Sequence, residues 1–293
     1  MTETRFHRLR SLLYVPADRE RFVAGAAARG ADAVILDLED GVAESAKPAA
    51  RAALAAAVPL VGAAGARVFV RINSRLAHAA DDIAAAVRAG ADGLLVPKTE
   101  DGQWLRLIAD RLGELERAAG RPEGWTRLVP LVETLRGLDR RAEIAAATPR
   151  SLALVCGTED LSAEIGAEPD SAVLRLAQQQ VLLAARGAGL LPLGLMGSLA
   201  GIDDLDALRR AAEEAVRQGF EGASCIHPAQ VAVLNQAFTP DAAVVDRARR
   251  IVAALQPGQG TAKVDGRMVD APVVARARRV LARAGVAEDA TGG

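Results

Sequence analysis

The stretch AVILDLEDGVAESAKPAARAALAAAVPLVGAAGARVFVR, residues 33–71, contains one complete repeat of the pattern that decides the fold. It begins with a nearly continuous apolar run at 33–37, continues with an alanine-rich helical pattern from about Lys47 to Ala57, and ends with a second apolar run at 67–71. Short runs of this kind are typical of strands that are buried on both faces, as in parallel sheets. The stretch therefore predicts a strand–helix–strand unit of an α/β protein.

The same alternation extends in both directions from this stretch. Eight short apolar runs, each followed by a helical pattern, lie at 11–15, 33–37, 67–71, 93–97, 127–132, 152–156, 190–193 and 222–226. Eight such units in about 230 residues are typical of a closed (β/α)8 or TIM barrel. The alternative is an open sheet that binds a dinucleotide, which needs a glycine-rich turn after its first strand. The corresponding turn here, Pro16-Ala-Asp-Arg-Glu20, contains no glycine.

The pattern also predicts how the chain is divided. We expect a TIM-barrel catalytic domain over residues 9–238 and a C-terminal helical extension or lid over 239–286. Arginines recur at helical spacing in the extension, which is interrupted by the polar segment QPGQG at 256–260. We expect residues 287–293 to form a disordered tail.

Composition excludes several classes of function. The 36 basic and 37 acidic residues leave a net charge of -1, and aromatic residues make up only 3% of the chain. A nucleic-acid-binding protein usually has a basic surplus or stacking aromatics. The apolar stretches are too short and too interrupted for a membrane helix, and residues 1–10 lack the apolar core of a signal peptide. We therefore expect a cytoplasmic protein with no nucleic-acid or membrane partner, in which Cys156 and Cys225 are buried, reduced thiols.

In a barrel, functional side chains follow the carboxyl ends of the strands. Glu133 and Asp160 follow two neighbouring predicted strands, so both carboxylates can point to one spot. Two hard oxygen ligands with room for water suit Mg²⁺. The alternative is that either residue caps a helix or is an exposed loop acid.

Three cationic or titratable side chains lie at the same predicted rim. Arg71 is placed to bind a carboxylate or a developing oxyanion; alternatively, it forms a structural salt bridge with Asp37 or Glu39. Lys98 is either a Schiff-base nucleophile or a rim ion pair or phosphate contact. His227 is a candidate base, or a residue that packs at the end of a strand.

The chain resembles the citrate lyase β-subunit and malyl-CoA lyase branch of the HpcH/HpaI aldolase family. Nine motifs carry the resemblance, in order and over residues 9–284: RSLLYVP (10–16), VILDLEDGV (34–42), VRIN (70–73), VPK (96–98), LVET (131–134), GTEDL (157–161), GFEG (219–222), IHPAQ (226–230) and GRMVD (266–270). The resemblance implies a TIM-barrel lyase that uses Mg²⁺ on coenzyme A thioesters and assembles as a homotrimer or hexamer.

The resemblance also implies a role for individual residues. Glu133 and Asp160 match metal ligands, and Arg71 matches the arginine that holds a substrate oxygen. Asp37 and Glu39 match acids around the metal. Arg10, Arg19 and Lys98 match segments that face coenzyme A. Asp270 matches an aspartate that the C-terminal lid donates to the active site of a neighbouring subunit.

One segment departs from the family pattern. Relatives of malyl-CoA lyase carry an acidic Asp-Gly-Pro-Phe segment after the seventh strand, whereas this chain has GLMGS at 194–198 followed by GIDD at 201–204. The expected reaction is the cleavage of a citryl-, citramalyl- or malyl-CoA-like 3-hydroxy-3-carboxyalkyl thioester to an acyl-CoA and an oxo acid. The alternatives are a thioester hydrolase or malate-synthase-like condensing enzyme, a CoA-independent metal aldolase, and a subunit that acts only within a citrate lyase complex.

Overall fold

A computed structural model of the protein describes residues 6, 8–197, 204–255 and 260–286. The expected tail, 287–293, and residues 198–203 of the divergent segment lie outside the described residues.

Eight parallel strands form the centre of the molecule. They are β1 (Ser11–Pro16), β2 (Ala33–Asp37), β3 (Arg67–Arg71), β4 (Gly93–Val96), β5 (Arg127–Val132), β6 (Ala153–Cys156), β7 (Leu191–Leu193) and β8 (Ala223–Cys225). The strands pair in the order β7-β6-β5-β4-β3-β2-β1-β8, and every pair is parallel. A parallel bridge between Leu193 and Gly222 joins the two ends, so the sheet closes. The closure confirms the predicted (β/α)8 barrel.

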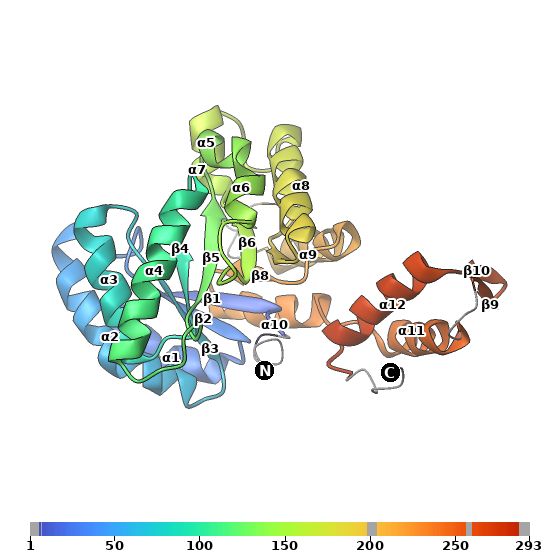
Figure 1. The fold of residues 1–293 in the computed structure, drawn as a ribbon, viewed down its shortest axis with the longest axis horizontal. Coiled ribbons are helices and arrows are strands. Elements are labelled where there is room, and N and C mark those ends of the chain that lie inside the picture. Colours follow the sequence, from blue (N-terminus) through green and yellow to red (C-terminus); the bar gives the residue numbers. More distant parts are fainter. Residues whose placement is uncertain (1–5, 7, 198–203, 256–259, 287–293) are drawn as a thin grey trace.

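Helices surround the strands (Figure 1). They are α1 (Glu20–Ala26), α2 (Lys47–Gly62), α3 (Leu76–Ala89), α4 (Gly102–Ala118), α5 (Leu135–Asp139), α6 (Arg141–Ala145), α7 (Thr158–Ile165), α8 (Ala172–Gly187), α9 (Leu205–Gln218) and α10 (Pro228–Ala237), with short 3-10 helices η2 (Ala27–Arg29) and η3 (Glu44–Ala46). The helical pattern that follows the apolar run at 127–132 spans about 138 to 147 and predicts one helix, whereas the structure has the two short helices α5 and α6, which meet at Arg140.

The core has two layers because each strand is buried on both faces. Inward-facing side chains such as Ile35, Phe69 and Leu95 fill the barrel lumen, and Phe6 packs with them. A larger cluster fills the space between the strands and the helices. Gly222 permits the closure, since a Cβ atom at this position would lie 1.7 Å from the backbone oxygen of Leu9. The packed lumen leaves the strand ends as the places where polar side chains can gather.

The C-terminal extension lies beside the barrel, beyond α10 (Figure 1). It consists of α11 (Ala242–Ala254), a hairpin of β9 (Ala262–Val264) and β10 (Arg267–Val269), and α12 (Ala271–Arg283). The two helices pack against each other around Val245, Ala248, Ala277 and Leu281. The extension is helical as predicted, but the hairpin was not predicted, because its two strands are only three residues long and contain just one buried residue.

Both cysteines are buried free thiols, as the sequence predicts. Among the described residues, no helix is both long enough and apolar enough to cross a membrane.

Candidate functional site

Polar side chains gather at the carboxyl ends of five neighbouring strands. Asp37 ends β2, Arg71 ends β3, Lys98 follows β4, Glu133 follows β5, and Asp160 lies in the first turn of α7 after β6. All eight strands are parallel, so these positions share one end of the barrel. Their contacts, described below, join them into a single cluster.

Arg71 is held in place by two buried acids. Its Nε and Nη2 atoms each donate a hydrogen bond of 2.7 Å to a different carboxylate oxygen of Asp37. Its Nη1 atom lies 3.1 Å from Glu39 Oε2. Both acids are almost completely buried. The salt bridges that sequence analysis left as an alternative are therefore present, and they fix the guanidinium at the mouth of the barrel with N–H donors to spare.

A second network holds the backbone that carries Glu39. The buried Lys47 Nζ donates to the carbonyl oxygens of Leu38 and Glu39, at 3.1 and 2.9 Å, and to Asn73 Oδ1 at 2.5 Å. Asn73 in turn donates to Leu38 O and to Asp82 Oδ2. These hydrogen bonds hold the backbone of the loop after β2 in place, and they therefore fix the position of Glu39.

Glu133 lies at the centre of the cluster and is buried. The backbone N–H of Lys98 donates to its Oε1 atom at 2.7 Å. Lys98 adopts a left-handed φ of 46°, which is unusual for a residue with a side chain and orients this N–H. Gly157 provides the space on the other side, because a Cβ atom there would lie 2.3 Å from Glu133 Oε2. The local backbone is therefore shaped around this carboxylate.

Lys98 connects Glu133 to three other acids. Its Nζ atom lies 3.2 Å from Glu39 Oε1, 3.5 Å from Asp40 Oδ2 and 3.6 Å from Asp160 Oδ1. Burial alone lowers the pKa of Lys98, but Glu39, Asp160 and Asp40 together outweigh it and raise the pKa. Because a charged ammonium is a poor nucleophile, the geometry favours the rim ion pair over the Schiff-base alternative.

Burial raises the pKa of Glu133 to about 7; the hydrogen bond from Lys98 opposes this shift, while Asp160 and Glu39 add to it. In the metal-free protein the folded state thus keeps a proton that the unfolded state releases above its ordinary pKa of 4.5. The free energy of unfolding should therefore fall as pH rises from about 4.5 to about 7, by up to roughly 3 kcal/mol from this group.

Chemical denaturation in EDTA at pH 5 and pH 8 measures this effect. Glu133→Gln is neutral at both pH values. We expect its free energy of unfolding to be no higher than that of the wild type at pH 5, and to rise relative to that of the wild type at pH 8. An unchanged stability difference between the two pH values would contradict the raised pKa.

The donor set fits a hard divalent cation. Glu133 and Asp160 offer carboxylate oxygens, and Glu39 Oε2 is buried without a hydrogen-bond partner among the described residues, although Arg71 lies close by. In the part of the chain that the structure describes, no three His, Cys, Asp or Glu side chains form a ready metal-binding group. Mg²⁺ commonly binds through only one or two carboxylates and completes its six positions with water and substrate oxygens.

Arg10 does not join the cluster. It precedes β1 and therefore lies at the amino end of the barrel, opposite the carboxylates. Its Nε and Nη2 atoms each donate to Asp32 at 2.8 Å, and its Nη1 atom donates to Thr239 Oγ1 at 2.8 Å. The side chain thus links the start of β1 to the residue before β2 and to the end of α10, and the expectation that its segment faces coenzyme A stays a prediction.

The two remaining predicted residues lie outside the cluster. Arg19 follows β1 at the mouth end; its side chain is 65% exposed and lies 3.6 Å from Asp18. Asp270 caps α12 in the extension and accepts a hydrogen bond of 3.2 Å from Val273 N. Neither residue contacts Glu133 or Asp160 within this chain, so the predicted role of Asp270 requires the neighbouring subunit. His227, the candidate base, caps α10.

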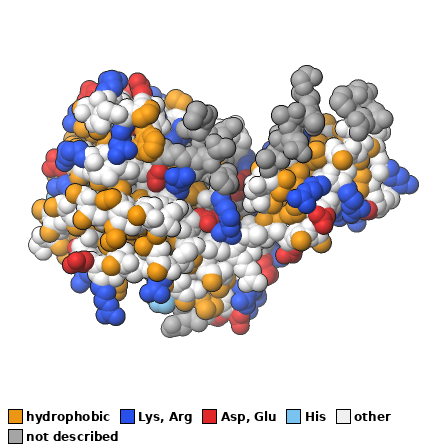
Figure 2. Space-filling model, turned by 90° about the horizontal axis from the view of Figure 1, so that it is seen from below, with side chains coloured by type: hydrophobic (Ala, Val, Ile, Leu, Met, Phe, Trp, Pro, Cys, Tyr) orange, Lys and Arg blue, Asp and Glu red, His pale blue; other side chains and the backbone are white. Residues whose placement is uncertain are grey.

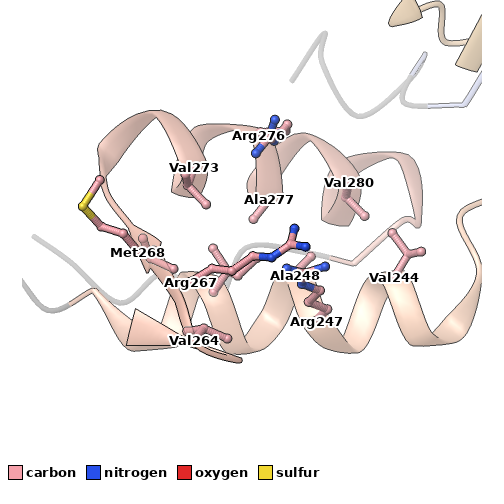
Figure 3. A pocket seen from close by; sticks show the side chains of 12 residues that line it. Val244, Arg247, Ala248, Val264, Arg267, Met268, Val273, Arg276, Ala277 and Val280 are labelled. Atoms are coloured by element: carbon pink, nitrogen blue, oxygen red, sulfur yellow. The ribbon is translucent and has the colours of Figure 1, made fainter. Parts of the chain in front are cut away.

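Two cavities differ in chemistry. The first, of about 440 Å³, opens beside the cluster and is lined by Glu39, Asp40, Val42, Glu44, Lys47, Asn73, Ser74, Arg75, His78 and Lys98. The second, of about 310 Å³, lies between α11, α12 and the hairpin, where Arg247, Arg267 and Arg276 accompany valines and Met268 (Figure 3). Seen from below, the extension carries hydrophobic and basic side chains together (Figure 2). No acid lines the second cavity, whereas the first reaches the cluster through Glu39 and Lys98.

The role of Lys47 was not predicted from the sequence, although one signal pointed to it. The chain has 36 basic residues, of which only Lys47, Lys98 and Lys263 are lysines. A lysine has a compact ammonium group in place of a planar guanidinium, so a rare lysine is one signal of a distinct position, although the exposed Lys263 does not follow it. Lys47 and Lys98 both lie at the site.

Fold and site together define a (β/α)8-barrel protein with an acidic, arginine-containing site at the carboxyl ends of its strands. A model of the HpcH/HpaI aldolase/citrate lyase family matches residues 10–228. The chain belongs to this family of enzymes, as the motifs of the sequence predicted.

Similar proteins include two curated relatives with different names. A (3S)-malyl-CoA thioesterase of Cereibacter sphaeroides is 35% identical over 285 residues, which cover 95% of each chain. Citrate lyase subunit beta of Escherichia coli K12 is 35% identical over 283 residues, which cover 94% of this chain and 93% of that protein. The structure of CitE from Mycobacterium tuberculosis in complex with magnesium, acetoacetate and coenzyme A is also similar, with a TM-score of 0.74 and 37% identity, covering 96% of this chain and 99% of that chain.

Proposed function

We propose that this protein is a Mg²⁺-dependent carbon–carbon lyase that cleaves a 3-hydroxy-3-carboxyalkyl-CoA thioester to an acyl-CoA and a 2-oxo acid. The observation that carries the proposal is the cluster in which Glu39 and Lys98 link the fixed guanidinium of Arg71 to Glu133 and Asp160. The magnesium, acetoacetate and coenzyme A of the similar CitE structure are the ligands that such a cluster would take.

In this proposal Glu133 and Asp160 hold Mg²⁺. Bound there, the cation would supply Lewis acidity that stabilises negative charge on the substrate. It also favours the ionised form of Glu133, whose pKa is raised to about 7 without it.

The other residues orient the substrate. Arg71, fixed by Asp37 and Glu39, uses its remaining N–H donors on the substrate oxygen that becomes the keto oxygen of the product. Lys98 Nζ and the exposed Arg19 lie on the rim, where they can attract the phosphates of coenzyme A. The thioester then reaches the mouth, which matters because a carbanion beside a thioester is easier to form than one beside a carboxylate.

Asp270 of a neighbouring subunit is proposed to protonate the carbon beside the thioester after its bond to the oxo acid has broken. The protein would then act as a homotrimer or hexamer, in the cytoplasm. We expect Asp270→Asn to bind coenzyme A and metal normally but to lose turnover, since an amide cannot transfer the proton.

Subunit mixing tests the shared site. Asp270→Asn and Arg71→Lys are co-expressed with different affinity tags, and the doubly tagged assemblies are purified. If sites are shared, some of them combine a normal Arg71 with a normal Asp270, so turnover should exceed that of both single variants. Doubly tagged assemblies with no more turnover than the variants alone would contradict the role across subunits.

A second candidate function is thioester hydrolysis, which the similarity to a (3S)-malyl-CoA thioesterase favours. Citramalyl-, malyl- and citryl-CoA should each be incubated with the isolated protein and Mg²⁺, while the oxo acid and the free thiol are followed separately. A lyase releases oxo acid and no thiol, whereas a thioesterase releases thiol. If the isolated chain turns over none of these esters, the result supports the alternative in which the protein is a subunit that requires partner lyase chains.

A further inference from the structure

Tyr14 is the only tyrosine of the chain, and it lies within the barrel lumen. It belongs to β1, two residues before the strand ends, and pairs in register with Ile35 of β2. Its strand neighbours Leu13 and Val15 are buried, and so is Ile35, but Tyr14 keeps part of its surface accessible. Because packed side chains fill the lumen beneath it, this access comes from the mouth.

The Tyr14 ring supports the arginine of the site. The guanidinium carbon of Arg71 lies 5.0 Å from the ring centroid, within the range of a cation–π contact. Burial raises the pKa of Tyr14; Arg71 opposes the shift, and Glu133, Asp37 and Glu39 add to it. The phenol therefore stays protonated at neutral pH and remains a hydrogen-bond donor among acids.

The Tyr14 hydroxyl has no hydrogen-bond partner among the described residues. Ser11, at the other end of the same strand, shows the usual arrangement: its buried hydroxyl donates to Asn235 Oδ1 at 2.7 Å. Polar groups in such places are normally paired, by protein or by bound molecules. A protonated donor that is unpaired, reachable from the mouth and next to Arg71 is placed to serve a ligand.

We propose that the Tyr14 hydroxyl is a further catalytic group, which donates a hydrogen bond to the substrate oxygen on which negative charge develops, beside Arg71. The inference rests on the proposed lyase function and deepens it, since it names a second donor for that oxygen. The proton stays on the phenol throughout, and Tyr14 makes and breaks no covalent bond. Because the bond strengthens as the oxygen gains charge, it acts on kcat more than on substrate affinity.

Tyr14→Phe tests the proposal, because it removes the hydroxyl and keeps the ring beneath Arg71. With Mg²⁺ and the best CoA ester, we expect kcat to fall roughly 100-fold, as for the loss of one oxyanion donor, with KM within about twofold of the wild type. The thermal midpoint should stay within about 2 °C. A fall in kcat of less than tenfold would overturn the proposal.

Ser11→Ala is the matched control, because it removes a hydroxyl from the same strand at the opposite end. It should lower stability and leave kcat within about twofold of the wild type. A loss of kcat in Ser11→Ala equal to that in Tyr14→Phe would mean that any damage to β1 inactivates the protein, and would overturn the specific role of Tyr14.

A binding measurement separates this inference from the proposed function. If the wild type turns over no CoA ester, the lyase proposal has failed, and calorimetric binding of oxalate in the presence of Mg²⁺ then tests Tyr14 alone, because oxalate carries a negatively charged oxygen in place of the neutral keto oxygen. Binding that is at least fivefold weaker in Tyr14→Phe than in the wild type supports the donor role. Equal binding, or no binding by the wild type, overturns it.

Discussion

Glu133→Gln is expected to lose Mg²⁺-dependent turnover by roughly 1,000-fold or more, and Asp160→Asn by a similar factor. Each variant replaces a charged oxygen ligand by a neutral amide of the same size, so the shape of the site is preserved while its affinity for the cation falls. If the cation supplies most of the charge stabilisation in the reaction, its loss costs at least about 4 kcal/mol of transition-state stabilisation.

The two variants should differ in stability. Glu133 is 3% exposed and hydrogen bonded to the backbone, whereas the Asp160 side chain is 42% exposed. Asp160→Asn should therefore leave the free energy of unfolding almost unchanged, which makes it the cleaner test of function. Asp139→Asn is the matched control, since this acid is exposed at the end of α5 and should keep full activity. Full activity of Glu133→Gln or Asp160→Asn, or of the wild type in excess EDTA, would contradict the metal site.

Substitution of Arg71 is expected to have the second large effect, on both activity and stability. Arg71→Ala leaves Asp37 buried without its counter-charge and removes one of the two cations beside Glu39, and breaking a buried ion pair in this way costs about 3–5 kcal/mol. Arg71→Lys keeps the charge but loses the two parallel hydrogen bonds to Asp37. We therefore expect the lysine variant to fold and to lose turnover by roughly 100-fold.

The control for Arg71 is available on the same strand. Arg67 begins β3 at the amino end of the barrel, where it lies 3.6 Å from Asp92. Arg67→Lys should retain wild-type turnover, which is measured with the same CoA ester, and its unfolding should differ little from that of the wild type. If Arg71→Lys is as active as Arg67→Lys, the substrate oxygen is not held by the guanidinium.

The barrel could be predicted from the sequence because its strands are buried on both faces. Such strands appear as short apolar runs, and the runs at 33–37, 67–71 and 127–132 coincide with β2, β3 and β5. The hairpin of β9 and β10 could not be predicted in this way, since only one of its strand residues is buried and the strands carry no such pattern.

The candidate site was only partly predictable. Parallel strands bring the residues after each strand to one end, which placed Asp37, Arg71 and Glu133 together. The same rule places Arg10, which precedes β1, at the opposite end, where the structure has it. The side-chain contacts could not be predicted. Nothing in the sequence shows that the backbone N–H of Lys98 donates to Glu133 while its ammonium group lies beside Asp160.

The central claim is that Glu133 and Asp160 bind one divalent cation beside Arg71. The most direct measurement is anomalous diffraction from crystals of the wild-type protein soaked with Mn²⁺, which replaces Mg²⁺ in oxygen sites and scatters anomalously. We expect one strong peak at about 2.1 Å from a carboxylate oxygen of each acid. If no peak lies between these two side chains, or if the strongest peak lies elsewhere, Glu133 and Asp160 do not bind the cation.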